Sequence, residues 1–210
     1  MTIWFATGNA HKRTELEAIL RAASPENIGV RIPSAADIPF DPEETGASFR
    51  ENALIKARAL HRLLAERGFR EPVLADDSGL CVDALGGRPG IYSSRYRGRD
   101  GAGETAAPID DARRNALLLE ELGDAGDRTA RFICAMVLLY SQNRFCIVQE
   151  TMEGEIVRNL SDARGSGGFG YDPVLYIPEK GCTVAELPGT LKNSLSHRGK
   201  AGRAIAKLLV

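Results

Sequence analysis

Hydrophobic and polar residues follow strand-like and then helix-like periods from the first residues of the chain. Residues 2–6 form a short apolar run that predicts a strand, and a glycine turn separates it from a helical pattern over residues 11–23. Leu16, Ile19 and Leu20 lie on one side of that helix, with the 3.6-residue period of an amphipathic helix. A strand, a glycine turn and a helix in this order open an α/β unit.

The rest of the chain adds further strands and helices. Ser48 begins a long predicted helix that ends near Arg67, with Glu51 at capping-box spacing. The other predicted strands cover residues 29–32, 72–75, 131–140, 144–152 and 171–177, and a third helix covers residues 110–122. The pair at 131–140 and 144–152 is separated by a short polar turn typical of a β-hairpin. The sequence therefore predicts a mixed β-sheet flanked by helices.

The C-terminal segment has a helical pattern, and the absence of a linker, a repeat or a low-complexity tract favours one domain over residues 1–210. Its expected buried positions are Leu191, Leu195, Ile205, Leu208 and Leu209. Residues 101–109 are expected to form a flexible loop.

Composition narrows the classes of function. The 210 residues are 43% hydrophobic and 26% charged with a formal net charge of -1, which gives no overall field to attract nucleic acid or a membrane. No apolar run reaches the ~18 residues of a membrane span, and the first residues lack a signal-peptide pattern. These features predict a cytoplasmic enzyme or binding protein. The four cysteines form no CxxC pair and are expected to be reduced, mostly buried and not catalytic.

Candidate chemistry begins where residues 72–75, an apolar run, lead into Asp76, Asp77, Ser78 and Gly79. We interpret this as a short interior strand that stops at a turn, where two neighbouring carboxylates serve a metal ion or a proton transfer. An ordinary turn is the alternative, because Asp, Ser and Gly are common turn residues.

Two further segments are candidates for binding phosphate and metal. Residues 7–12 join a strand to a helix N-terminus, where free backbone N–H groups and Lys12 favour an anion; a plain helix cap with a solvated lysine is the alternative. The acidic loop at residues 41–46 supplies oxygen ligands for Mg²⁺ if it folds over Asp76 and Asp77, and is otherwise an exposed loop.

The C-terminal third carries groups suited to a flat base. Phe169 and Tyr171 lie among glycines and suit stacking, although most aromatic residues are simply core. Lys192, His197 and Arg198 gather donors at a predicted helix end, and the last two can hydrogen-bond a carbonyl oxygen while rejecting an amino group. The alternative is a C-terminal helical turn whose positive charges complement the helix dipole.

Five motifs in this order resemble those of the inosine triphosphate pyrophosphatase family, from Thr7 to Arg198. They are TGNAHK at 7–12, EETG and FRENA at 43–53, DDSGL at 76–80, GGFGYDP at 167–173 and SHRG at 196–199. The resemblance implies an α/β fold with a central cleft between two lobes. It also implies Mg²⁺-dependent hydrolysis of ITP, dITP or XTP to monophosphate and pyrophosphate by a cytoplasmic homodimer, without nucleic-acid or membrane partners.

The resemblance also implies roles for individual residues. The triphosphate would be bound by Thr7, Gly8, Asn9, Ala10, His11 and Lys12. Glu43 and Asp77 would hold the metal, Asp77 would accept a proton from the attacking water, and Ser78 would touch the substrate. The base pocket would comprise Phe169, Gly170, Tyr171, Asp172, Lys192, His197 and Arg198. The sequence leaves open whether Asp77, Asp76 or a metal-bound hydroxide takes the proton, and which purine or sugar is preferred.

The sequence is compatible with two rival functions. A hydrolase of modified pyrimidine nucleotides would share the phosphate end, but His197 and Arg198 speak against it. A nucleotide- or RNA-binding module would use the basic run of Arg95, Arg97 and Arg99, which is otherwise an exposed strand or an interface. Such a module has no need of Glu43 and Asp77.

Overall fold

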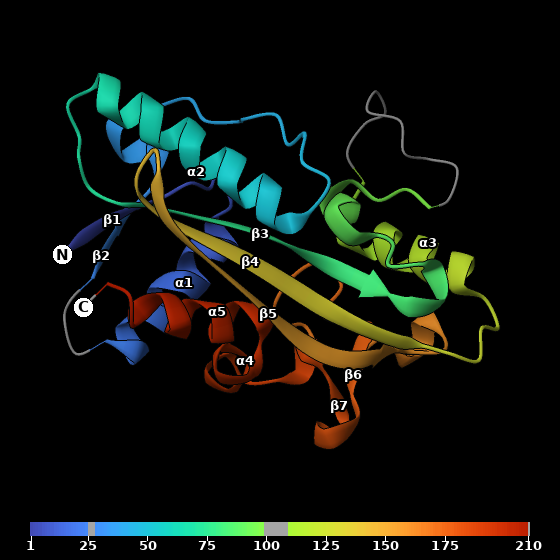
Figure 1. Ribbon diagram of the computed structural model, residues 1–210. Helices are drawn as coiled ribbons and strands as arrows, with labels where there is room; N and C mark the ends of the chain where they lie inside the picture. The colour runs from blue at the N-terminus through green and yellow to red at the C-terminus, as the bar shows by residue number, and fades with distance from the viewer. Residues whose placement is uncertain (25–27, 99–108, 210) are drawn as a thin grey trace. The chain divides into compact units, whose positions relative to one another are not determined.

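The computed structural model describes residues 1–24, 28–98 and 109–209 (Figure 1). Its strands are β1 (Thr2–Phe5), β2 (Gly29–Arg31), β3 (Val73–Val82), β4 (Thr129–Ser141), β5 (Arg144–Ile156), β6 (Leu175–Ile177) and β7 (Cys182–Thr183). Its helices are α1 (Ala10–Ala23), α2 (Phe49–Glu66), α3 (Asp111–Leu122), α4 (Gly189–Leu195) and α5 (His197–Ala206). Arg99 and residues 101–108 of the predicted flexible loop lie outside the described residues. No helix in the described ranges has the length and apolar character needed to cross a bilayer.

The chain forms two compact units that share the three longest strands. Unit 1 comprises Met1–Ser78, Cys134–Thr151 and Asn193–Val210, and unit 2 comprises Gly79–Ile133 and Met152–Lys192. The boundaries therefore fall inside β3, β4 and β5, so that each of these strands begins in one unit and ends in the other.

The strands form a seven-stranded sheet in the order β2-β1-β3-β4-β5-β6-β7. β1 pairs in parallel with β2 and β3, whereas β6 pairs antiparallel with β5 and β7. β4 and β5 are consecutive strands joined at Gln142 and Asn143, as the hairpin pattern predicts. The predicted mixed sheet flanked by helices is confirmed.

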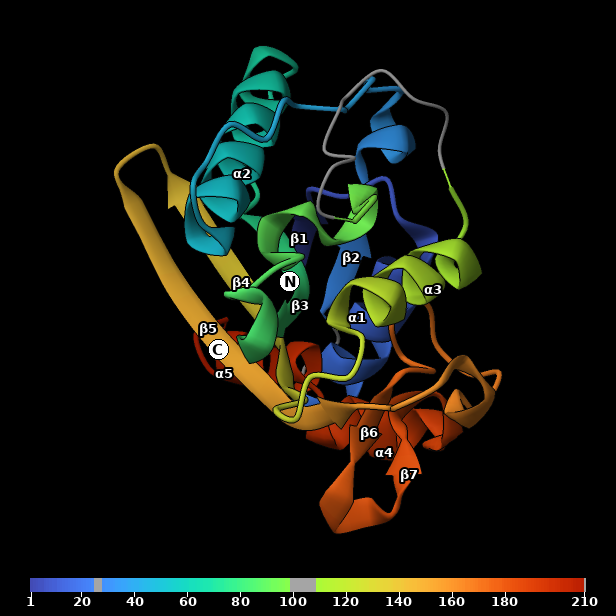
Figure 2. The ribbon, with the colours of Figure 1, turned by 90° about the vertical axis from the view of Figure 1, so that its right-hand side faces the viewer.

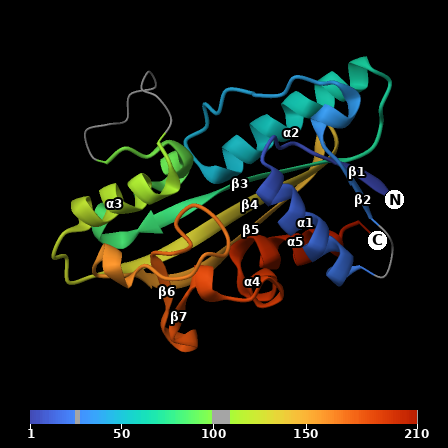
Figure 3. The same cartoon turned by 180° about the vertical axis from the view of Figure 1, so that it is seen from behind.

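The first core of unit 1 lies between one face of the strands and helices α1 and α5, which lie side by side in Figures 1 and 3. Its strand residues are Ile3, Phe5, Leu74, Cys134, Met136 and Leu138, and its helix residues include Leu16, Leu20, Ala201 and Ile205. Gly202 permits the close approach of α5 to α1, because a Cβ there would lie 2.7 Å from the Ile19 side chain. This packing fixes α1 and the start of α5 against the sheet.

The second core of unit 1 lies on the opposite face, which α2 covers (Figures 1 and 3). It contains Trp4, Ala6, Val73, Ala75, Val137 and Leu139 from the strands and Ala53, Ala57, Leu60 and Leu64 from α2. Consecutive residues of a strand point to opposite faces. Leu74 accordingly joins the first core, and its neighbours Val73 and Ala75 join the second.

Unit 2 contains α3, the remaining parts of the long strands, and the short pair β6 and β7 seen in Figure 2. Gly79 allows a close approach inside this unit, because a Cβ at this position would lie 2.3 Å from Ser93 Oγ and 2.5 Å from the Gly90 carbonyl oxygen. Ser93 Oγ accepts the Leu80 N–H at 2.9 Å. This bond ties the segment around Ser93, residues 90–95, to β3.

The structure corrects several predictions. The strand predicted over residues 171–177 is confined to β6, because residues 171–174 form a turn. β3 does not stop at a turn after residue 75, because it continues to Val82 with Asp76 and Asp77 inside it. Leu191 and Leu208 are exposed and Leu195 is half-buried, although the sequence predicts burial for all three, since Ser196 caps a new helix and breaks the period on which that prediction relied. His197 and Arg198 therefore begin helix α5 instead of ending a helix.

Candidate active site

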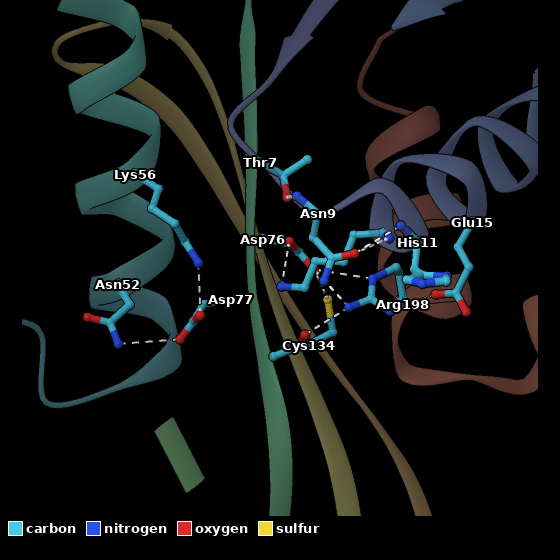
Figure 4. Close-up of polar contacts among 12 residues, drawn as sticks. Thr7, Asn9, His11, Glu15, Asn52, Lys56, Asp76, Asp77, Cys134 and Arg198 are labelled. Carbon is cyan, nitrogen blue, oxygen red and sulfur yellow. Dashed lines mark hydrogen bonds and ion pairs between the residues drawn. The ribbon is translucent and has the colours of Figure 1, made fainter. Parts of the chain in front are cut away.

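The two adjacent carboxylates of β3 point to opposite faces of the strand. Asp76 has the same parity as Leu74 and faces α1 and α5, whereas Asp77 has the parity of Ala75 and faces α2. Figure 4 shows the two side chains directed away from each other, each toward its own set of partners. The pair therefore provides two separate sites on one strand.

Asp76 is buried and held by two cations. Its Oδ1 accepts from Lys12 Nζ at 3.0 Å, and its Oδ2 accepts from Arg198 Nε at 3.2 Å and Nη2 at 3.0 Å. Burial alone would raise the pKa of Asp76, but Lys12 and Arg198 outweigh it and hold the pKa well below its usual range. Asp76 is consequently a fixed anion that binds α1 and α5 to the strand.

Beside it, the Cys134 thiol donates to Asp76 Oδ2 at 3.9 Å. Burial raises the pKa of Cys134 to about 12, with the Asp76 charge adding to the effect. The thiol is therefore protonated and inert. The sequence predicts burial for most of the cysteines, but only Cys134 is buried, whereas Cys81, Cys146 and Cys182 are half-buried.

Arg198 distributes its donors over three partners. Besides Asp76, Nη1 donates to Glu15 Oε2 at 2.7 Å and Nη2 donates to Ser78 Oγ at 2.8 Å. Its side chain is 2% exposed. These contacts bring the predicted residues Lys12, Ser78 and Arg198 together around Asp76.

Asp77 lies in a different environment, against α2. Its Oδ1 accepts from Lys56 Nζ at 2.9 Å and its Oδ2 accepts from Asn52 Nδ2 at 3.4 Å. Burial raises the pKa of Asp77 and is only partly opposed by Lys56. Burial by itself would lower the pKa of Lys56, but Asp77, Asp76 and Glu44 raise it, so the lysine is a cation.

The acidic loop reaches this environment through Glu44, whose Oε1 accepts from Lys56 Nζ at 2.9 Å. Asn52 Oδ1 accepts the Gly46 N–H at 2.8 Å and so ties the end of the loop to α2. Glu43, the predicted metal ligand, is exposed. Lys56 thus lies between the carboxylates of Glu44 and Asp77, a place where a cation is already accommodated.

The segment from Thr7 to Lys12 is a capped helix start. Asn9 Oδ1 accepts the N–H groups of His11 at 2.9 Å and Lys12 at 3.1 Å, and Thr7 Oγ1 accepts the Asn9 N–H. The residues between Gly8 and His11 are exposed. The helix cap read from the sequence is present, and Lys12 is engaged with Asp76 instead of being solvated.

Unit 2 holds a second polar cluster around Asp172. Its Oδ2 accepts from Lys192 Nζ at 2.8 Å and from the Phe169 N–H at 2.8 Å. Lys192 Nζ lies 5.1 Å from the centroid of the Phe169 ring, in cation–π geometry. Gly168 makes room for this arrangement, because a Cβ there would lie 1.9 Å from Asp172 Oδ2. Tyr171 is buried and its hydroxyl donates to the Ser93 carbonyl oxygen at 2.9 Å.

A family model described as the Ham1 family matches residues 3–208. The chain belongs to the Ham1 family. A protein from Treponema denticola named dITP/XTP pyrophosphatase is 46% identical over 209 residues, covering 100% of this chain and 98% of its relative. A protein from Pseudomonas aeruginosa with the same name is 45% identical, with 93% and 90% covered.

Solved structures agree with this membership. A HAM1 protein from Coxiella burnetii matches with a TM-score of 0.82 and 39% identity, covering 100% of this chain and 98% of that protein. The Ham1 protein of Staphylococcus aureus matches with a TM-score of 0.78 and 34% identity, with the same coverage. The Ham1 fold therefore extends over the whole chain.

Sequence reasoning missed three residues that contact the predicted site of this Ham1 family member: Glu15, Asn52 and Lys56. Lys56 had a recognisable signal, since it lies on the apolar stripe of α2 with Phe49, Ala53 and Leu60, where a lysine needs a buried acid. Glu15 had no such signal, because it belongs to a run of ordinary surface charges. Glu44 belongs to the predicted acidic loop, although the resemblance pointed to its neighbour Glu43 as the metal ligand.

Proposed function

We propose that this protein hydrolyses deaminated purine nucleoside triphosphates, namely ITP, dITP and XTP, to nucleoside monophosphate and pyrophosphate. Its membership of the Ham1 family supports the proposal, as do the relatives named dITP/XTP pyrophosphatase. The observation that carries it is the difference between the two neighbouring carboxylates. Asp76 is ionised and paired with two cations, whereas burial raises the pKa of Asp77.

That asymmetry separates the roles of the two carboxylates. Asp76 keeps its charge and its partners and is a poor proton acceptor, since Lys12 and Arg198 stabilise its ionised form. Asp77 has the raised pKa expected of a general base. We therefore assign proton acceptance to Asp77 and a supporting role to Asp76.

In the proposed reaction a water oxygen attacks the α-phosphorus of the substrate. The bond from that phosphorus to the oxygen that bridges the α- and β-phosphates breaks, pyrophosphate leaves with the electron pair, and a proton of the water passes to Asp77. Lys56 fixes the carboxylate through Oδ1, while among the described residues Oδ2 accepts a single long bond, from Asn52, and keeps a lone pair for the proton.

The triphosphate end is assigned to residues 7–12 and Lys12, at the N-terminus of α1. The base is assigned to the cluster in unit 2, where Phe169 is half-buried and offers a ring for stacking. His197 and Arg198 remain assigned to recognition of the 6-oxo group, although the contacts of Arg198 with Asp76, Glu15 and Ser78 also support a role in positioning Asp76.

The residues near Asp77 fit Mg²⁺ as the cofactor. The part of the chain that the structure describes holds no group of three or more acidic, His or Cys side chains suited to a metal. Mg²⁺ nevertheless needs only one or two protein carboxylates, with water and substrate phosphates completing its shell. Asp77 with Glu44 or Glu43 would hold it. When bound, Mg²⁺ offsets the charge that develops on the departing pyrophosphate.

A substrate panel tests the proposal. The purified protein with Mg²⁺ is expected to convert ITP, dITP or XTP to monophosphate and pyrophosphate far faster than ATP or GTP, with pyrophosphate and orthophosphate measured separately. Release of orthophosphate, or equal rates with ATP, would contradict it. We further propose a cytoplasmic homodimer, which sedimentation analysis would distinguish from the 22.7 kDa monomer.

A further inference from the structure

Two side chains of α3 form hydrogen bonds with one residue of the glycine-rich segment at 165–170 in unit 2. The Gly170 N–H donates to Asp111 Oδ2 at 2.7 Å, and the Gly170 carbonyl oxygen accepts from Asn115 Nδ2 at 3.2 Å. Asp111 and Asn115 are four residues apart in the helix and therefore lie on the same face, one turn from each other. We call these two residues the α3 clamp.

The clamp acts on a backbone that has no regular structure of its own. Gly168 and Gly170 both have positive φ, at 74° and 65°, and lie on either side of Phe169. Such a segment has many accessible conformations. Asp172 fixes the N–H of Phe169 on one side, and the clamp fixes the following residue on the other.

The burial of Asn115 indicates that its contact is specific. Its residue exposure is 4%, and its Oδ1 has no hydrogen-bond partner among the described residues. A buried amide with one unpaired atom destabilises the helix relative to an apolar side chain of similar size. The bond to Gly170 is what this amide contributes that a leucine would not.

We propose that Asp111 and Asn115 are positioning residues that hold Phe169 ready to stack on the substrate base. The inference rests on the proposed function, which assigns that stacking to Phe169. Asp111 Oδ1 also accepts from Arg114 Nη2, a contact within the same helix. The clamp reaches the loop through the backbone of Gly170, so it acts on Phe169 through the loop and affects ligands that carry a base.

Equilibrium binding separates this role from a general structural one. We compare IMP, which has a base, with pyrophosphate, which has none, using Asp111→Ala, Asn115→Leu and Phe169→Ala. Each variant is expected to weaken IMP binding by about tenfold, within the range that base stacking contributes, and to leave pyrophosphate binding unchanged. Asp111→Asn keeps an acceptor for the Gly170 N–H and is expected to bind IMP like the wild type.

Asp110→Ala is the matched control. It removes the N-cap of the same helix, where Asp110 Oδ1 accepts the Arg113 N–H at 2.7 Å, and it leaves the bond to Gly170 in place. IMP binding should be unchanged in this variant. Hydrogen exchange of residues 165–172 gives a readout that does not depend on the substrate, and it should accelerate in the two clamp variants but not in Asp110→Ala.

The outcomes distinguish the two proposals. Unchanged exchange over residues 165–172 in both Asp111→Ala and Asn115→Leu would overturn the clamp, and so would an equal loss of IMP and pyrophosphate binding. Absence of ITP hydrolysis in the wild type would instead overturn the proposed function, while exchange would still test the clamp. Asp111 is partly exposed, so its replacement tests the clamp even if Asn115→Leu folds poorly.

Discussion

Neighbouring residues on one strand acquire different chemistry because their side chains meet different helices. Asp76 and Asp77 are the same residue type, yet Asp76 contacts Arg198 whereas Asp77 contacts Lys56 and Asn52 (Figure 4). Asp76 also accepts a hydrogen bond from Lys12. Two cations hold the pKa of Asp76 low, whereas burial raises the pKa of Asp77. Substitutions at these residues should therefore have different effects.

Asp77→Asn is expected to lower kcat by at least about 100-fold, because an amide cannot accept the proton of the attacking water. The amide retains the size of the side chain, so nucleotide binding should stay measurable. Steady-state kinetics with ITP and a binding titration check both parts. Activity like that of the wild type would show that a group other than Asp77 accepts the proton.

Asp76→Asn should instead destabilise the fold, by about 3 kcal/mol, because Lys12 and Arg198 lose their buried partner. The pKa of Asp76 is lowered on folding, so its contribution is complete above its unfolded pKa of about 3.9. It is lost as pH falls through the lower, folded pKa. Urea unfolding from pH 7 to pH 3 should show the gap between variant and wild type narrowing below about pH 4. A gap that widens in acid would contradict this assignment.

Glu44 and Glu43 form a matched pair for the metal site. Glu44→Gln is expected to raise the Mg²⁺ concentration for half-maximal activity by about tenfold, because Glu44 lies with Asp77 around Lys56. Glu43 is exposed, so Glu43→Gln should have the smaller effect. Mg²⁺ titrations of activity decide between them, and a larger effect of Glu43→Gln would restore the ligand predicted from the sequence.

At the scale of elements, β3 is longer than its apolar run. Two carboxylates inside a buried strand normally argue for a turn, but here Lys12, Lys56 and Arg198 compensate them from both faces. Gly79 then allows the strand to continue beneath the Ser93 segment. A close approach of backbone, and not a turn, explains this glycine.

Gly79→Ala is expected to destabilise the protein by about 1–3 kcal/mol, because the added methyl group overlaps Ser93 and the Gly90 carbonyl. Gly126→Ala is the control, since a Cβ there meets no atom within 4 Å. Urea unfolding monitored by circular dichroism compares them. Equal stability of the two variants would show that the Ser93 segment moves to accommodate the methyl group with little loss of stability.

At the scale of the whole molecule, the fold has its charges compensated without a metal. Two hydrophobic cores hold the helices of unit 1 on the strands, and the acids of β3 have lysine or arginine partners. Stability and activity should consequently respond differently to metal removal.

Chelation by EDTA is expected to abolish ITP hydrolysis and to shift the unfolding midpoint by less than about 1 °C. The fold relies on the ion pairs and cores, whereas the reaction needs charge on the leaving pyrophosphate to be offset. Thermal unfolding and activity assays with and without EDTA check this, and added Mg²⁺ should restore turnover. A large loss of stability would show that the metal is structural.

The sequence by itself determined the order of the elements up to β6, the mixed sheet, the helix caps at Asn9 and Ser48, and the motifs that mark the family. These depend on local periods, capping chemistry and contiguous motifs, which act within a few residues of one another. The tertiary structure alone decided that β3 continues past Asp77, that its carboxylates point to opposite faces, and that Lys56 contacts Glu44 and Asp77 while Asp111 and Asn115 contact Gly170. Those features depend on residues 12 to 122 positions apart in the chain, whose proximity only packing creates.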